Sequence, residues 1–148
     1  MTKTFFKLST VSLITILSSM SIANAGRVNI VNIDVPPEVN GVKMSRTLSF
    51  MGTNPSSYTN IEVPPQGLNP GTKPLPDNTY SDIAFGFSPV DPYGNAPHLS
   101  VFCNEEDNGQ KERVTIGPNT VLSLSVGYQP NEGPHGRVTC QIVHIGNK

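Results

Sequence analysis

The chain has 148 residues, and its 10 basic and 11 acidic side chains give a formal net charge of −1. That balance does not indicate nucleic-acid binding, which generally uses a strongly basic face. The 13 glycines and 14 prolines interrupt helices, and apolar residues do not recur at helical spacing after residue 25, so we expect an all-β chain.

Residues 1–25 have the pattern of a Sec signal peptide. Two lysines precede a mostly apolar run at 8–22, which leads to the A-x-A cleavage motif Ala23-Asn24-Ala25. The run is too short and too interrupted to span a membrane, and no polybasic or amphipathic stretch indicates binding to a membrane surface. We therefore expect export to the periplasm or beyond the cell, and a mature single domain formed by residues 26–148.

The mature chain is expected to begin with a strand at 27–35. Its apolar positions change parity between Ile30 and Val31, which predicts a β-bulge or a strand that changes sheets. Pro36-Pro37 ends the strand, because proline cannot donate to a ladder hydrogen bond.

A second strand, 42–50, carries a charge on its apolar face. The apolar residues of that face are Val42, Met44, Leu48 and Phe50. Arg46 interrupts them, and we consider two explanations. Arg46 is either structural, buried beside a carboxylate or lying at the rim with its stem packed, or it binds an anion or anchors a partner.

Residues 52–79 contain six prolines and three glycines, so this segment is expected to be a long loop with a functional or mobile character. It also holds an internal similarity, because 32–38 (NIDVPPE) recurs as 60–66 (NIEVPPQ). The two copies are either edge strands that continue into polyproline-like segments, or short ligands for a partner's groove.

The next strands are predicted from alternation and turn chemistry. Ile83, Phe85 and Phe87 face inward on one strand, 98–103 alternates on the next, and a further strand at 112–116 ends at the turn 117–119. Asn108-Gly109 is typical of a type I′ hairpin turn. With those two residues as the loop, the register places Glu106 opposite Lys111, Cys103 opposite Val114 and Glu105 opposite Glu112.

Two further strands follow, 120–127 and 137–145, joined by a loop at 129–136. Four consecutive strands would form a meander whose outer strands lie about 14 Å apart. A disulfide between Cys103 and Cys140 needs Cα atoms within about 7 Å. The last strand must therefore pair beside the first or face it from a second sheet, which predicts a single-domain antiparallel β-sandwich of about seven strands.

The meander places the 108–109 turn and the 129–136 loop at the same end of the sheet. Three acidic residues and a histidine are then expected at that end: Glu105, Glu112, Glu132 and His135. Together with Arg46 they are the candidate binding residues. Opposed carboxylates at Glu105 and Glu112 favour either a cation or partner site, or an exposed tip where the repulsion is screened by solvent.

The sequence predicts no metal site, cofactor or catalytic residue. The spacing of His98, His135 and His144 matches no structural zinc pattern. There is no G-x-S-x-G elbow and no glycine-rich loop before a helix, and the two cysteines are expected to be bonded rather than reactive.

Three functions fit these observations. The favoured one is a small exported recognition domain that binds a protein or glycan through its loops, as an inhibitor or adhesion factor does. The second is a structural subunit of a surface polymer, assembled by addition of the N-terminal strand to a neighbour's sheet. The third is a secreted hydrolase that uses the acidic end of the sheet. The sequence does not determine the oligomeric state.

Overall fold

The computed structural model describes residues 26–53, 57–63, 72–106 and 108–147. In these ranges there are ten strands and no helix: β1 (Arg27–Asp34), β2 (Glu38–Val39), β3 (Val42–Gly52), β4 (Tyr58–Glu62), β5 (Lys73–Pro74), β6 (Asn78–Pro89), β7 (Leu99–Phe102), β8 (Val114–Ile116), β9 (Thr120–Gln129) and β10 (Arg137–Asn147). The expected all-β class is confirmed. The three strands beyond the expected seven are β2, β4 and β5, which have two to five residues each.

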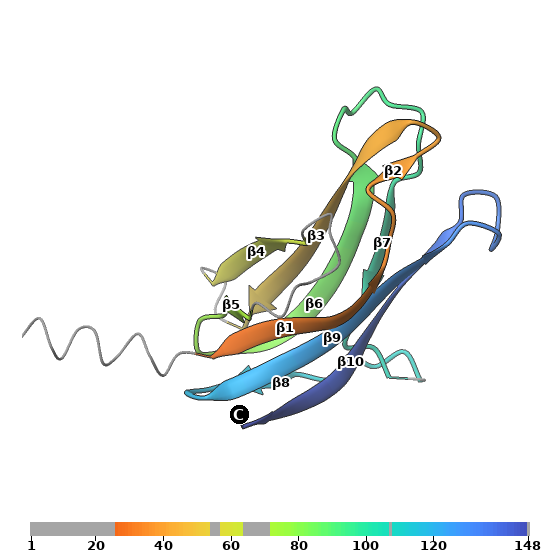
Figure 1. The fold of residues 1–148 in the computed structure, drawn as a ribbon. Coiled ribbons are helices and arrows are strands. Elements are labelled where there is room, and N and C mark those ends of the chain that lie inside the picture. Colours follow the sequence, from red (N-terminus) through yellow and green to blue (C-terminus); the bar gives the residue numbers. More distant parts are fainter. Residues whose placement is uncertain (1–25, 54–56, 64–71, 107, 148) are drawn as a thin grey trace, which may run out of the picture.

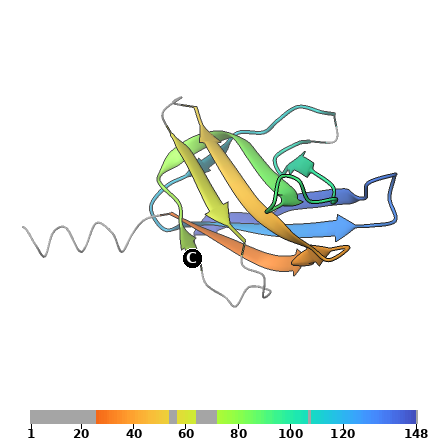
Figure 2. The same ribbon diagram turned by 90° about the horizontal axis from the view of Figure 1, so that it is seen from above.

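The strands form two facing sheets (Figure 1). One sheet has the order β10-β9-β1-β5, and the other has the order β2-β3-β6-β7, with β4 beside β3 and β8 beside β6. Seen from above, the six-stranded sheet lies over β9 and β10 with its strands at an angle to theirs (Figure 2). This is the two-layer sandwich that the cysteine pair predicts.

The sandwich is not wholly antiparallel, because β1 runs parallel to β9. The pairing register shifts between Ile30 and Asn32, so the bulge expected from the change of parity is present. Val31 projects outward at the bulge, and Val28 and Ile30 remain buried. The extra residue bends the strand at this point, and the apolar side chains before and after the bulge can both point into the core.

Inward-facing side chains of both sheets form the core. The predicted faces of β6 and β9 are buried, as is that of β3 except for the half-buried Val42, and Phe50, Phe85 and Phe87 have no exposed surface. Burying side chains of this size contributes about 1.5 to 3 kcal/mol each. The core therefore fixes which face of each strand points inward.

The disulfide Cys103–Cys140 joins the two sheets, with its Cα atoms 4.7 Å apart. Cys103 directly follows β7, and Cys140 lies on β10 of the opposite sheet. Of the two arrangements expected from the cysteine pair, the structure has the second, in which the last strand faces the earlier ones from another sheet.

The predicted meander is wrong. β7 and β8 do not pair with each other, because both pair with β6, β7 at 84–87 and β8 at 78–80. β9 and β10 belong to the other sheet. After β7 the chain therefore moves away from β6, and it returns at β8 to pair with β6 along the same edge.

Buried Asn104 explains this arrangement. Its side-chain amide donates to the carbonyl oxygens of Ser81 (2.9 Å) and Glu112 (2.6 Å), and its Oδ1 accepts from the amide of Ile83 (3.1 Å). The side chain thus replaces ladder hydrogen bonds at the point where β7 ends, since buried main-chain groups must be paired. One polar residue allows two short strands to share one neighbour.

The predicted register at Asn108-Gly109 is also wrong by one residue. Glu105 forms a bridge with Lys111, and the amide of Glu106 donates to the carbonyl of Gln110. A type I′ turn needs positive φ at both central residues. Of this pair only Gly109 has it, at 76°.

The segment 52–79, expected as one long loop, contains β4 and β5, and β6 begins within it at Asn78. β4 pairs with β3 over five residues. Of the two similar segments, 60–62 lies on the edge strand β4, and 32–34 lies on a part of β1 whose described partner is β9 alone, because β5 pairs only with Arg27 and Val28. The expectation of two edge strands therefore holds for the described parts of both copies, and 64–66 falls outside the described residues.

Tyr80 leads to a prediction about alkaline pH. The Tyr80 hydroxyl donates to the carbonyl of Pro76 inside the core. Burial, with a smaller contribution from the Asp77 charge, raises the pKa of Tyr80 above its ordinary value of 10.0. The folded state therefore keeps the proton after the unfolded state has lost it, so stability falls as the pH rises past 10.0.

The variant Tyr80→Phe tests this. At neutral pH it should be less stable by about 1 kcal/mol, because the hydrogen bond to Pro76 is lost. That difference should shrink as the pH rises past the ordinary pKa of tyrosine, since only the wild type carries this ionisation. Urea unfolding of both proteins between neutral and strongly alkaline pH measures it. A difference that stays constant with pH would contradict the assignment.

Candidate binding cleft

A cleft of about 700 Å³ lies at the end of the sandwich where β1 ends and the β9–β10 loop begins. Its lining comes from four separate stretches of chain: Asp34, Pro36, Glu38, Val39, Asn40, Asn95, Ala96, Pro97, Tyr128, Pro130, Pro134 and His135. Figure 1 shows the β2–β3 turn and the β9–β10 loop at this end. The volume is within the usual range for ligand sites in proteins.

One wall of the cleft is set by a tight hairpin between β2 and β3. Val39 pairs with Val42, and the two residues between them, Asn40 and Gly41, have φ values of 53° and 78°. This is the geometry of a type I′ turn. Asn40-Gly41 is the same dipeptide as Asn108-Gly109, and it is also typical of a hairpin turn. This sequence signal could have placed Asn40 in a turn and Glu38 on the strand beside it.

Tyr128 has a fixed position in the opposite wall. Its ring centroid lies 5.0 Å from that of Phe87. The ring also lies against Gly136. The φ of Gly136 is 81°, and a Cβ atom added there would lie 2.6 Å from Tyr128 Cε2. Residue 136 is therefore required to be glycine, because its φ is positive and because a side chain would overlap the Tyr128 ring. An aromatic ring held in this way offers a ligand a rigid surface at low entropic cost.

The charge in the cleft is negative. Asp34 and Glu38 are exposed carboxylates, and the described lining contains no lysine or arginine. Four prolines and Tyr128 supply rigid apolar surface between the polar groups. The cleft therefore combines a stiff, partly apolar wall with carboxylate and amide groups that can accept hydrogen bonds from a cationic ligand.

No family model, curated protein or solved structure matches this chain. Within the described ranges, no helix is long and apolar enough to cross a membrane. The function is therefore inferred from the geometry of the cleft and from the positions of the predicted site residues.

The structure distributes the predicted acidic residues and His135 over separate places, and only Glu105 and Glu112 share one. His135 lines the cleft. Glu132 forms an exposed ion pair with Arg137 at 3.4 Å. Glu105 and Glu112 line a separate hollow of about 280 Å³ beside the disulfide. The four-strand meander from which the acidic end of the sheet was predicted is not observed, because β9 and β10 belong to the other sheet.

The observed register removes the direct opposition expected between Glu105 and Glu112. In the observed register Glu105 lies opposite Lys111. The Lys111 ammonium lies 3.0 Å from the carboxylate of Asp82 and 3.5 Å from the ring centroid of Phe102. Over the described part of the chain, no group of three or more histidine, cysteine or acidic residues could hold a metal ion.

Arg46 is buried, with 3% of its surface exposed. Its Nη1 donates to the carbonyl of Val35 at 3.2 Å, and its own carbonyl accepts from the amide of Val63 at 2.8 Å. Burial lowers the pKa of Arg46, and the charge of Glu62 partly opposes that effect. Of the two explanations, the structural one agrees with this position, but the hydrogen-bond partner is a main-chain carbonyl rather than a carboxylate.

Val35 and Val63 are equivalent positions of the internal similarity, and both are buried beside Arg46. Val35 follows a strand of one sheet, and Val63 follows a strand of the other. Arg46 therefore links the ends of the two similar segments across the sandwich.

Proposed function

We propose that this protein is an exported recognition domain that binds an extended polypeptide segment bearing basic side chains in the cleft between the β2–β3 turn and the β9–β10 loop. The observation that carries the proposal is the composition of the described lining. It has two carboxylates, no lysine or arginine, and a rigid wall of Tyr128 and prolines. Rigid aromatic and proline surfaces suit an extended chain, and the carboxylates suit its lysine or arginine side chains.

Two further features support an exported binding domain. The Cys103–Cys140 pair is at disulfide distance, which fits an oxidising compartment. The cleft is formed by loops on a scaffold whose sheets are joined covalently, and loops held in this way commonly carry recognition.

Neutralising the cleft should weaken binding of basic peptides. We expect Asp34→Asn with Glu38→Gln to lower affinity about tenfold, because a basic side chain loses its charged partners. The probes are synthetic peptides of matched length that carry basic, neutral or acidic side chains, and fluorescence anisotropy measures their affinity. Added salt should weaken binding to the wild type more than binding to the variant.

A matched control is available in the second hollow. Glu105→Gln with Glu112→Gln removes the same amount of charge outside the cleft, and it should leave affinity unchanged. Equal losses in the two double variants would contradict the cleft assignment. Binding of neutral oligosaccharides in place of peptides, unaffected by either pair of substitutions, would favour a glycan ligand.

The structural-subunit hypothesis keeps one supporting observation. β1 is the first described strand, it buries Val28 and Ile30, and its long pairing is with β9 alone, since β5 covers only Arg27 and Val28. A strand with this position could be supplied by a neighbouring copy. Deleting 26–35 and measuring the native mass by light scattering tests it, because a stable monomer without β1 would exclude strand addition.

A further inference from the structure

Gly26, the residue after the predicted cleavage motif, is buried and closely packed. A Cβ atom at Gly26 would overlap Ile116 Cγ2 and lie 3.1 Å from the carbonyl oxygen of Leu75. The carbonyl of Gly26 accepts from the amide of Leu75 at 2.8 Å. The start of the described chain is therefore built into the sandwich and has room for glycine only.

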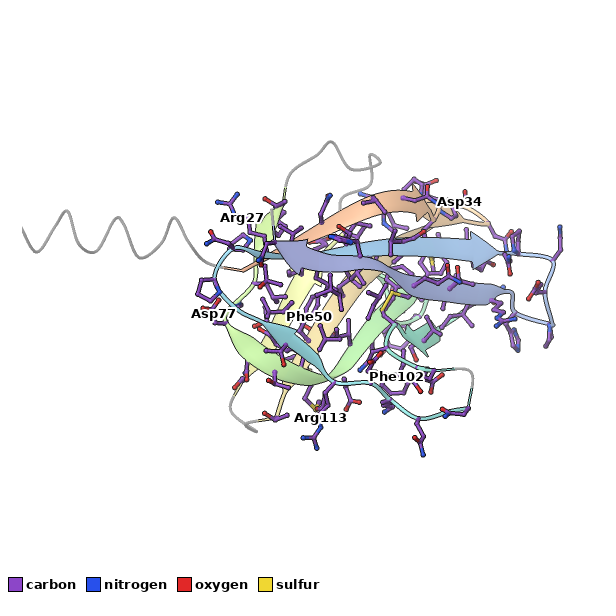
Figure 3. All side chains as sticks on the ribbon, turned by 90° about the horizontal axis from the view of Figure 1, so that it is seen from below. Arg27, Asp34, Phe50, Asp77, Phe102 and Arg113 are labelled. Atoms are coloured by element: carbon purple, nitrogen blue, oxygen red, sulfur yellow. A yellow bond between two sulfur atoms is a disulfide. The ribbon has the colours of Figure 1, made fainter. Side chains whose placement is uncertain are left out.

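The nitrogen of Gly26 has an acidic partner. It donates to Asp77 Oδ1 at 3.2 Å. Asp77 is exposed and precedes β6 by one residue. The neighbouring cation, Arg27, is directed elsewhere, because its Nη1 donates to Thr72 Oγ1 at 3.1 Å. Figure 3 shows Asp77 and Arg27 at one end of the sandwich and Asp34 toward the other, so this contact is remote from the cleft.

We infer that the Gly26 ammonium group, released when the peptide bond after the predicted A-x-A motif is hydrolysed, pairs with Asp77. A peptidase hydrolyses this bond with water, leaving a carboxylate on Ala25 and an amine on Gly26. That amine takes up a proton at neutral pH, since its ordinary pKa is about 8. The inference extends the predicted A-x-A cleavage motif and is independent of the proposed cleft function.

Processing then strengthens the fold. Before cleavage, the Gly26 nitrogen is a neutral amide and makes an ordinary hydrogen bond to Asp77. After cleavage the donor carries a positive charge, and charge-assisted hydrogen bonds are roughly twice as strong as neutral ones. The pair ties the beginning of β1 to the segment that leads into β6, so the two sheets gain a polar connection at the end opposite the cleft.

The test compares two otherwise identical oxidised proteins released from a cleavable leader, one beginning at Gly26 and one with a single alanine before Gly26. We expect the added residue to lower the folding equilibrium constant about threefold to tenfold, measured by urea unfolding. In an Asp77→Asn background the added residue should have no such effect. This coupling separates an ion pair from simple crowding at Gly26, which would cost the same in both backgrounds.

The intact mass of the protein exported from the full-length chain gives the second readout. A mass that begins at Gly26 supports the inference. A mature chain that begins at another residue would overturn it, as would an added alanine that costs the same in the wild type and in the Asp77→Asn variant.

Discussion

Replacing both Cys103 and Cys140 by alanine is expected to lower the free energy of unfolding by about 3.8 kcal/mol. The disulfide closes a loop with a sequence separation of 37 residues, and the chain-entropy model assigns that value to a loop of this length. The loop includes β8 and β9 and ends on β10. The cross-link therefore restricts a large part of the unfolded chain.

Urea unfolding of the double variant and of the oxidised and reduced wild type measures this effect. Both half-cystines are buried, and the alanine side chain is apolar, so the substitution introduces no unpaired polar group. The double variant should resemble the reduced wild type. A loss below about 1 kcal/mol would show that the unfolded chain gains little freedom when the bond is removed.

Replacing Arg46 by alanine is expected to lower the free energy of unfolding by about 3 kcal/mol. Two losses combine: the buried stem leaves a cavity, and the carbonyl of Val35 loses its donor. Because Arg46 lies between the ends of the two similar segments, the sheets should also separate locally at this point.

Arg46→Met separates these two losses. Methionine keeps much of the buried volume without the charge, so only the unpaired carbonyl of Val35 remains, at a cost of about 1 to 2 kcal/mol. Lys43→Ala provides a control on the same strand, because Lys43 is exposed and should change stability by less than about 0.5 kcal/mol. Equal stability of Arg46→Ala and wild type, measured in urea, would contradict a structural role.

The sequence was sufficient to predict the features that depend on period-two alternation and on the cysteine pair. The inward faces of β3, β6 and β9 follow from alternation alone, because a shift of one residue would expose every apolar side chain. The bulge near Val31 follows from the change of parity. The second sheet follows from the distance that a disulfide between Cys103 and Cys140 requires.

The errors arose where pairing depends on contacts remote in sequence. A local rule at Asn108-Gly109 predicted a hairpin, but buried Asn104 bonds to Ser81 and Ile83, which are 23 and 21 positions away, and keeps β7 and β8 apart. The parallel pairing of β1 with β9 has no local signal, because their residues are about 90 positions apart.

The cleft was missed for the same reason. Of the candidate residues predicted from the sequence, only His135 lines it. Asp34, Glu38 and Tyr128 belong to separate strands, and each is unremarkable in its own segment. Their proximity depends on how the sheets face one another, which alternation does not determine.

The most direct test of the cleft proposal follows the amide chemical shifts of the mature, oxidised protein during titration with the basic peptide of highest affinity. We predict that the shifts concentrate at the residues of the cleft wall, including Val39, Asn95 and Ala96, and that they are lost in the Asp34→Asn, Glu38→Gln variant. Shifts centred on the hollow beside the disulfide, or none at saturating peptide, would contradict the proposal.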